Sequence, residues 1–177
     1  MSRSRVARSL VRARTTDPKP VAAAVTAAAP EEQLADFIAR YDAPVARLAR
    51  EARAALRPQM LTAIELVYDN YQFLAIGFSA TERASDCIVS LAVSPKGVAL
   101  SFPYGVSLPD ARAILLGGGN RNRYIRLESA ATLTSPAVRA LVRAAVAAAP
   151  SRLPVSGRGY LVIKSVSAKQ RPRRSTQ

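Results

Sequence analysis

The chain has no histidine, no tryptophan and a single cysteine among its 177 residues. Without histidine, neither a Ser-His-Asp nor a Cys-His nucleophile system can form, and zinc sites built on His and Cys are excluded as well. Only carboxylates, Tyr, Lys, Arg and hydroxyl groups remain for acid and base chemistry, and no catalytic constellation of these is recognisable. We therefore expect a protein that is not an enzyme.

Long apolar runs are also missing. The most apolar strand-like stretch, residues 73–78, is far shorter than the roughly 20 residues that a membrane-spanning helix needs, so we expect no membrane partner. The lone Cys87 permits no intramolecular disulfide, which favours the cytoplasm. An Arg-rich start followed by the Ala-rich residues 21–29 has the outline of a secretion signal or a transit peptide, but the run is weakly hydrophobic, and a disordered arm is the expectation.

Acidic residues are scarce, and the net charge of +14 is uneven along the chain. Residues 1–20 carry +5, residues 151–177 carry +7, and the middle is close to balance. The sequence therefore predicts three parts: a disordered basic arm rich in Arg, Ala and Pro (1–30), one domain (31–149) and a basic tail (150–177). Such ends attach weakly to nucleic acid or another polyanion by counterion release, without reading sequence.

Helical periodicity marks both ends of the predicted domain. Apolar residues recur at helical spacing after Glu31 and again between Pro44 and Pro58, where Arg53 and Arg57 are expected away from the apolar stripe. A last helix is expected from Pro136 to about residue 149, and a short helical piece near residues 111–116. The stripes are Leu34, Phe37, Ile38 and Tyr41 for the first helix, Val45, Leu48, Ala49, Ala52 and Leu56 for the second, and Val138, Leu141, Val142 and Val146 for the last.

Between these helices the side-chain period changes to two, which is typical of strands. Strands are expected over residues 64–69, 73–78, 87–93, 98–102 and 124–128, and the short links between the first four predict an antiparallel meander. In the first strand, Ile64, Leu66 and Tyr68 form one face and Glu65, Val67 and Asp69 the other. Residues 160–166 form either an edge strand or part of a disordered tail. The fold class is thus α+β, with about five antiparallel strands packed against N-terminal and C-terminal helices.

Two stretches together resemble a known family. The strings at residues 65–71, 75–78 and 81–86, with the later segments 115–128 and 133–148, are similar to the YdhG-like family of bacterial domains of unknown function. The resemblance implies a compact α+β fold with a curved antiparallel sheet. Because some members are grouped with frataxin-like iron chaperones, it also implies iron handling and a chaperone-like role. Here Gly119-Asn120 replaces the Gly-Lys-like step that we would expect.

Three acidic side chains are candidate metal ligands: Glu65, Asp69 and Asp86. Carboxylate oxygens suit hard cations, and the first two residues share one face of a strand. They lie about 13 Å apart at ~3.3 Å per residue, too far to share one ion without further oxygens, which Asp86 or Glu82 would have to supply. The alternative is that they are ordinary solvent-facing acids.

The remaining candidates are ligand-binding residues in two places. Gly118 and Gly119, with Arg123 and Arg126 behind them, form a glycine loop that would cradle a phosphate or carboxylate, or else simply end a helix. Tyr68, Asn70 and Tyr71 cluster at one turn and would line a pocket or serve the turn itself. Cys87 is expected to be a small buried hydrophobe.

The sequence thus favours a binding module. The first hypothesis is a non-enzymatic module for a small ligand or a metal ion, with a chaperone-like role; the alternative is a protein that associates with nucleic acid through its basic tails. An apolar sheet face left uncovered by few helices would favour a homodimer.

Overall fold

The computed structural model describes residues 29–110 and 112–175, and in this part of the chain six strands form one mixed sheet. Its order is β5-β4-β3-β2-β1-β6. The strands are β1 (Ile64–Asp69), β2 (Leu74–Ser79), β3 (Cys87–Ser94), β4 (Gly97–Phe102), β5 (Arg123–Leu127) and β6 (Leu161–Val166). The α+β class is confirmed, and the five expected strands pair antiparallel, but a sixth strand joins β1 in parallel, so the sheet is mixed and not purely antiparallel.

The antiparallel meander from β1 to β4 is confirmed. Successive strands pair along their whole length, and the turn of Ser94 to Gly97 closes β3 on β4, with Gly97 at a φ of +124° that favours glycine. A bulge opposite Phe78 and Ser79 shifts the start of β3. It brings Ile88 into the core and places the Cys87 sulfur beside Gly77, outside the main core cluster.

β6 comes from the segment that the sequence left open between an edge strand and a disordered tail. It pairs with β1 from Glu65 opposite Leu161 to Asp69 opposite Val166. A parallel pair requires a long crossover, and here the chain passes through α3 (Pro136–Ala147) and residues 148–160 before it reaches β1. The chain after residue 149 therefore contributes a strand to the same sheet.

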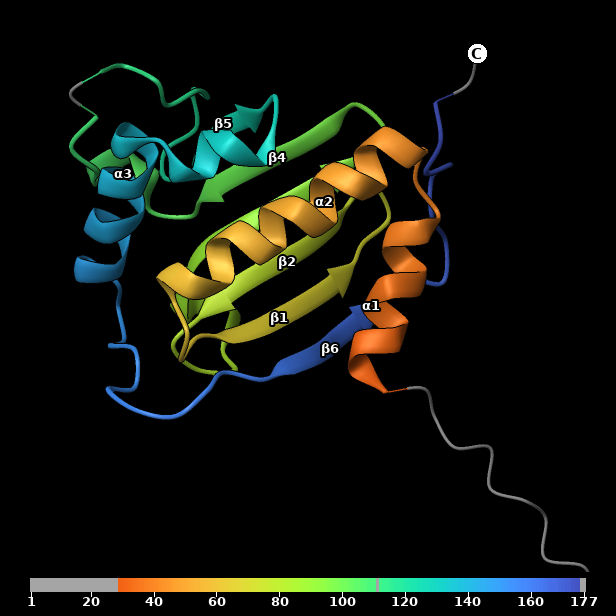
Figure 1. Cartoon of the computed structure of the whole chain (residues 1–177), viewed down its shortest axis with the longest axis horizontal. Coiled ribbons are helices and arrows are strands. Elements are labelled where there is room, and N and C mark those ends of the chain that lie inside the picture. The colour runs from red at the N-terminus through yellow and green to blue at the C-terminus, as the bar shows by residue number, and fades with distance from the viewer. Residues whose placement is uncertain (1–28, 111, 176–177) are drawn as a thin grey trace, which may run out of the picture.

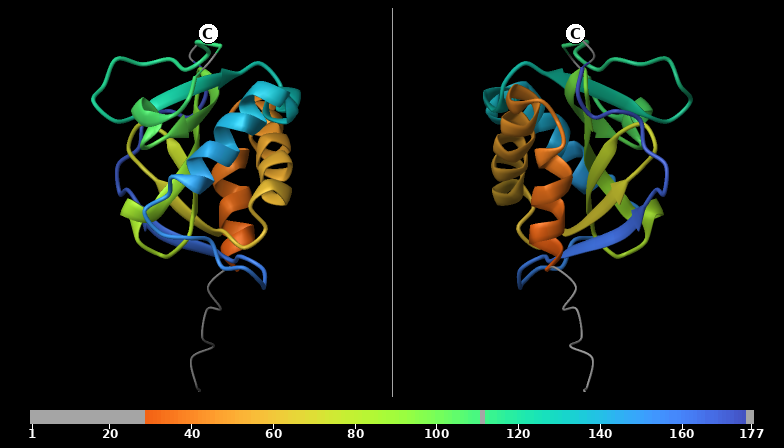
Figure 2. Two further views of the ribbon diagram at one scale, coloured as in Figure 1. Left: turned by 90° about the vertical axis from the view of Figure 1, so that its left-hand side faces the viewer. Right: turned by 90° about the vertical axis from the view of Figure 1, so that its right-hand side faces the viewer.

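Helices α1 (Pro30–Ala39) and α2 (Ala43–Leu56) lie on one side of the sheet, with α2 running diagonally across it (Figure 1; Figure 2). α2 approaches the sheet closely because its buried side is small: Ala46, Ala49 and Ala52, with Leu56 at the end. In α3, the Ser135 hydroxyl accepts a hydrogen bond from the backbone N–H of Val138 and caps the helix as expected. The core lies between these helices and the sheet.

The short helix expected near residues 111–116 is absent from its described part. Instead, the Asp110 carboxylate accepts hydrogen bonds from the backbone N–H groups of Ile114 and Leu115, at 3.0 and 2.8 Å. Leu116 then forms an isolated bridge with Tyr124 beside β5. An acidic side chain that bonds the backbone competes with helix formation, which explains the difference.

The face assignment of β1 is also wrong. Glu65 and Asp69 are not the solvent-facing acids of the alternative given above: they are 2% and 1% exposed and lie on the same side as the fully buried Val67, beneath the helices. Leu66 is buried as well, on the opposite face of the sheet beside Gly77. Both faces of β1 are therefore covered, and its acids need partners.

Among residues 29–110 and 112–175, no helix is both long enough and apolar enough to cross a bilayer. Of the arm expected over residues 1–30, residues 1–28 lie outside the described part of the chain.

Candidate functional site

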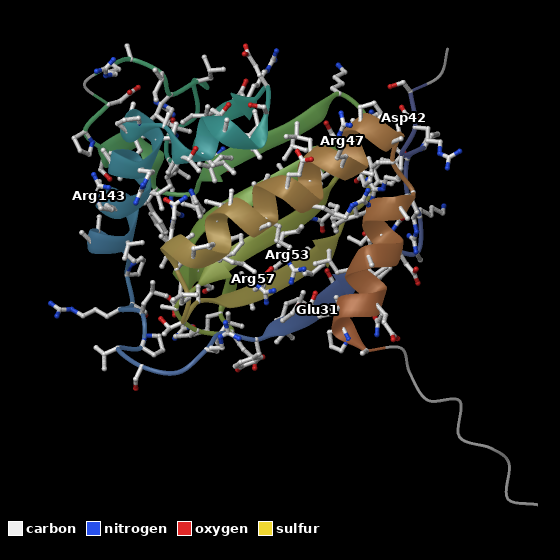
Figure 3. All side chains as sticks on the ribbon, viewed as in Figure 1. Glu31, Asp42, Arg47, Arg53, Arg57 and Arg143 are labelled. Carbon is white, nitrogen blue, oxygen red and sulfur yellow. The ribbon has the colours of Figure 1, made fainter. Side chains whose placement is uncertain are left out.

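The Glu65 end of β1 carries four linked charges, which we call the Glu65 cluster: Glu31, Arg53, Arg57 and Glu65. Arg53 Nε donates to Glu65 Oε2 at 2.5 Å, and Arg57 Nε lies 2.6 Å from Glu65 Oε1. The other two nitrogens of Arg53 hold Glu31 at 2.7 and 2.8 Å. Figure 3 shows Arg53, Arg57 and Glu31 gathered where α1 and α2 meet the sheet. Arginines expected to point away from the helix stripe are thus the partners of a buried acid.

The cluster fixes the charge of its members. Burial lowers the pKa of Arg53, but hydrogen bonds to Glu31 and Glu65 outweigh this effect and leave the pKa above its ordinary value. The hydrogen bond from Arg53 holds the pKa of Glu31 below its usual range. Arg57 is the more exposed of the two arginines, with 46% of its side chain in solvent against 14% for Arg53. It is therefore the cation of the cluster best placed to meet a ligand.

A cavity of about 390 Å³ adjoins this cluster. Glu65 and Arg57 form its polar side, and Met60 and Phe78 contribute an apolar wall. Arg158 approaches from the segment that leads into β6, and in the described part of the chain no hydrogen bond or ion pair holds its guanidinium. The remaining lining residues are Ala54, Pro58, Leu61, Ala63 and Gly159. We call this cavity the Arg158 pocket.

Gly159 fixes the wall that carries Arg158. Its backbone N–H donates to the Leu61 carbonyl at 2.9 Å, and a Cβ built on it would lie only 1.7 Å from the Ala63 carbonyl oxygen. Only glycine permits this close approach of two backbones. One wall of the Arg158 pocket is therefore a tightly docked segment.

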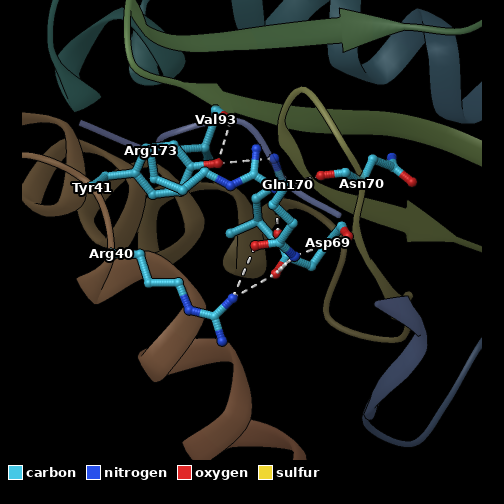
Figure 4. Close-up of polar contacts among 8 residues, drawn as sticks. Arg40, Tyr41, Asp69, Asn70, Val93, Gln170 and Arg173 are labelled. Carbon is cyan, nitrogen blue, oxygen red and sulfur yellow. Dashed lines mark hydrogen bonds and ion pairs between the residues drawn. The ribbon is translucent and has the colours of Figure 1, made fainter. Parts of the chain in front are cut away.

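The other end of β1 carries a second group, the Asp69 cluster: Arg40, Asp69, Gln170 and Arg173 (Figure 4). Asp69 Oδ1 accepts from Arg173 Nη2 at 2.7 Å, and Oδ2 accepts from Arg40 Nη1 at 3.0 Å and Gln170 Nε2 at 2.5 Å. Arg173 Nη2 also donates to the Asn70 carbonyl. Arg173 is 6% exposed, and its Nε and Nη1 find no hydrogen-bond partner in the described part of the chain.

Tyr41 supports this cluster from the α1–α2 junction. Its ring lies 5.6 Å from the Arg173 guanidinium, and its hydroxyl donates to the Val93 carbonyl while accepting from the backbone N–H of Leu74. Burial raises the pKa of Tyr41. The C-terminal segment is thus anchored inside the fold by a cation over an aromatic ring.

The expected metal site does not fit these residues. Glu65 and Asp69 are each paired with two arginines, and Asp86 accepts a hydrogen bond from Thr81 at 2.7 Å, which lowers its pKa. Within residues 29–110 and 112–175, no group of three or more His, Cys, Asp or Glu side chains could hold a metal ion. An acid already neutralised by arginine is a poor ligand for a further cation.

The expected glycine loop is exposed, and its arginine points back at it. Arg123 Nη1 donates to the carbonyls of Gly119 and Asn122, at 2.5 and 2.9 Å, so this guanidinium is occupied by the loop itself. Gly118 lies in open space, and Arg126 lies on the outer face of β5. The structure does not bring these four residues together around one pocket.

The expected turn residues hold the β1–β2 connection together. The Asn70 backbone N–H donates to Phe73, and the Tyr71 ring lies 5.7 Å from the Arg171 guanidinium. Tyr68 pairs with Ala75 across the sheet. These three residues therefore contact the C-terminal segment and the sheet rather than the Arg158 pocket.

Sequence reasoning missed Arg53, Arg57 and Arg158 as site residues. A signal for the first two was present, because residues four apart on a helix share a face and both are basic, whereas the nearby strand carries two acids. Arg158 had no such signal, since its place depends on the docking of β6.

A scan of protein-family models, a search of curated proteins and a search of solved structures each found no match to this chain.

Proposed function

We propose that this protein is a non-enzymatic binding module that takes a small organic anion in the Arg158 pocket. The observation that carries the proposal is the arrangement of two arginines at one cavity: Arg57, half-exposed and already aligned by Glu65, and Arg158, whose guanidinium has no partner in the described chain. Guanidinium groups bind carboxylate and phosphate groups with two parallel hydrogen bonds.

The size and walls of the pocket support a ligand with an apolar body. Its volume of about 390 Å³ lies at the lower end of the usual range for small-molecule sites, roughly 300–1,000 Å³. Met60 and Phe78 offer apolar contact on one side, and the arginines offer charge on the other. A short- to medium-chain carboxylate or a phosphorylated small molecule fits this division.

The test is calorimetry on the full chain with butyrate, octanoate and inorganic phosphate as probes. We expect binding of at least one probe and a loss of about tenfold or more in affinity for Arg158→Ala, because a charge-assisted hydrogen bond disappears. Arg152→Ala is the matched control, since Arg152 is exposed in the same connection but does not line the pocket. Equal affinity of the Arg158→Ala variant and the wild type, or no heat with any probe, would overturn the proposal.

Iron handling and a chaperone-like role belong to the same proposal only through the resemblance to the YdhG-like family. The arginine-paired carboxylates speak against iron in this chain. Adding ferrous iron to the same calorimetric series distinguishes anion binding from iron binding, since iron-binding heat that is unchanged in Arg158→Ala would favour a metal site elsewhere in the protein.

We propose a cytoplasmic location on the basis of the single cysteine.

Polyanion association through the basic ends is the second candidate function. One observation favours it: Arg171 and Arg174 remain exposed although the segment around them is docked. Replacing Arg171 and Arg174 by Ala in the full chain should then make the salt dependence of binding to an oligonucleotide shallower. An unchanged salt dependence would place the binding elsewhere.

A further inference from the structure

We infer that the outer face of the sheet binds single-stranded nucleic acid. This inference is independent of the Arg158 pocket and of the basic ends as carriers of affinity. It starts from the side of the sheet opposite the helices, which pack on the face with the core cluster (Figure 2). On the outer side, the middle of the sheet is built almost entirely from small residues.

Cross-strand pairing places these small residues in two rows. Ala92 pairs with Ala75 and Ala99, and Ser90 pairs with Gly77 and Ser101. Two adjoining hollows of about 570 and 430 Å³ lie above them and share Phe73, Ala92, Ala99 and Tyr124. We call the combined hollow the sheet trough; its floor and aromatic sides include Phe73, Ser90, Ala92, Ala99, Ser101 and Tyr124.

Two aromatic rings stand at the trough. Phe73 precedes β2 and is 37% exposed, which is unusual for a phenylalanine beside a strand, and Tyr124 rises from β5 opposite Ser101. Bases stack on aromatic rings presented by a sheet in many single-strand binding proteins, and every base has a face that can stack. A floor of Gly, Ala and Ser leaves room for bases to reach the rings.

Two cations line the border of the trough. They are Lys96 and Arg126, whereas Glu128 is the single acid among its lining residues. These two cations favour the phosphates of a polyanion.

The same features argue against a second copy of the chain as the occupant. Two copies face to face would bring their cationic borders together, and like charges at an interface oppose association. The small floor residues also offer little apolar area to bury. A nucleic acid strand meets both conditions, since it supplies negative charge and flat apolar rings.

Fluorescence anisotropy of a labelled 12-nucleotide single strand with the full chain tests the inference. We expect Phe73→Ala and Tyr124→Ala each to weaken binding by about tenfold while the dependence on salt stays the same, because stacking involves no counterions. Phe73→Trp should restore binding. Because Phe73 is exposed and outside the strand, its variants keep the test valid if Tyr124→Ala fails to fold.

Charge variants give the complementary result. Replacing Lys96 and Arg126 by Ala should reduce the slope of log K against log salt by about 1.4, the amount expected for two phosphate contacts on a single strand. The matched control replaces Arg139 and Arg143 on α3, on the helix side (Arg143 in Figure 3), and should change the slope less. Tyr160→Ala is the aromatic control, exposed at 52% away from the trough.

Three results would overturn the inference. One is equal binding by Phe73→Ala and the wild type, which would leave the basic ends as the carriers of affinity. Another is equal affinity for a duplex and for the single strand, because the bases of a duplex are not free to stack on the rings. The third is a dimer in sedimentation that Phe73→Ala converts to a monomer, which would identify a second copy as the occupant.

Discussion

Each end of β1 buries a carboxylate, and the two ends neutralise it with residues from different segments of the chain. Glu65 and Asp69 are both buried carboxylates beneath the helices, and each meets two arginines. The Glu65 cluster draws its cations from α2 and the turn after it, 8 to 12 residues before the acid. The Asp69 cluster takes Gln170 and Arg173 from more than 100 residues later in the chain.

The two clusters differ in the counter-charges of their more buried arginine. Each acid meets one half-exposed arginine, Arg57 at 46% and Arg40 at 44%, but Arg53 is also paired with Glu31, whereas Arg173 is sealed between Asp69 and the Tyr41 ring. Removing one partner of a buried ion pair costs more than forming the pair gains, because the remaining charge stays out of water. The Asp69 cluster should therefore serve stability, and the Glu65 cluster keeps Arg57, paired but half-exposed, at the border of a cavity.

The largest effect is expected at the sealed end. Asp69→Asn should lower the free energy of unfolding by about 3–5 kcal/mol, because Arg173 would remain buried without a counter-charge. Urea denaturation followed by circular dichroism measures this loss. The double variant Asp69→Asn with Arg173→Met should be more stable than Asp69→Asn alone. If the second change adds to the loss instead, Arg173 is not a buried charge that depends on Asp69.

The matched change at the open end should cost less. Glu65→Gln is expected to lower the free energy of unfolding by about 1–2 kcal/mol, since Arg57 can turn to solvent and Arg53 keeps Glu31. The same urea titration compares the two variants directly. A loss as large as that of Asp69→Asn would show that the second counter-charge, Glu31, does not compensate Arg53.

The smallest effect concerns Glu31, half-exposed at the border of the Glu65 cluster. Its ion pair with Arg53 lowers the pKa of Glu31 from 4.5, so the stabilisation is present above that pH and disappears as the pH falls through the lowered value. Glu31→Gln should cost at most about 1 kcal/mol at pH 7, after screening by solvent.

Thermal unfolding of the Glu31→Gln variant and the wild type between pH 3 and pH 7 is the measurement. Their difference should shrink toward the acid end of this range. A difference that stays constant with pH would mean that the ion pair with Arg53 contributes nothing to stability.

The helices and the meander could be predicted because their signals are local. Pro44 and Pro58 bracket one helix, Ser135 caps another, and turn residues separate strands whose apolar positions alternate. The helix expected near residues 111–116 failed for a local reason too, since Asp110 bonds the backbone that a helix would use.

Most of the candidate site could not be predicted from the sequence because its parts are distant in the chain. Alternation along β1 could not show that Glu65 is covered, since the covering arginines belong to another element. The contact of Gly159 with Ala63, which places Arg158 beside the pocket, depends on the pairing of β6 with β1. Of the residues that the sequence singled out for ligand binding, Arg126 alone lines one of the cavities described above, and that cavity is the sheet trough.

The parallel pairing of β6 with β1 has a consequence for synthesis. When a ribosome has produced residues 1 to 150, the meander can already form, but β1 is then an unpaired edge strand with its backbone open to other chains. Asp69 at that stage lacks Arg173, and residues 161–173 supply both the missing strand and this arginine when they emerge. Premature termination near residue 160 should accordingly yield a nearly complete protein that aggregates.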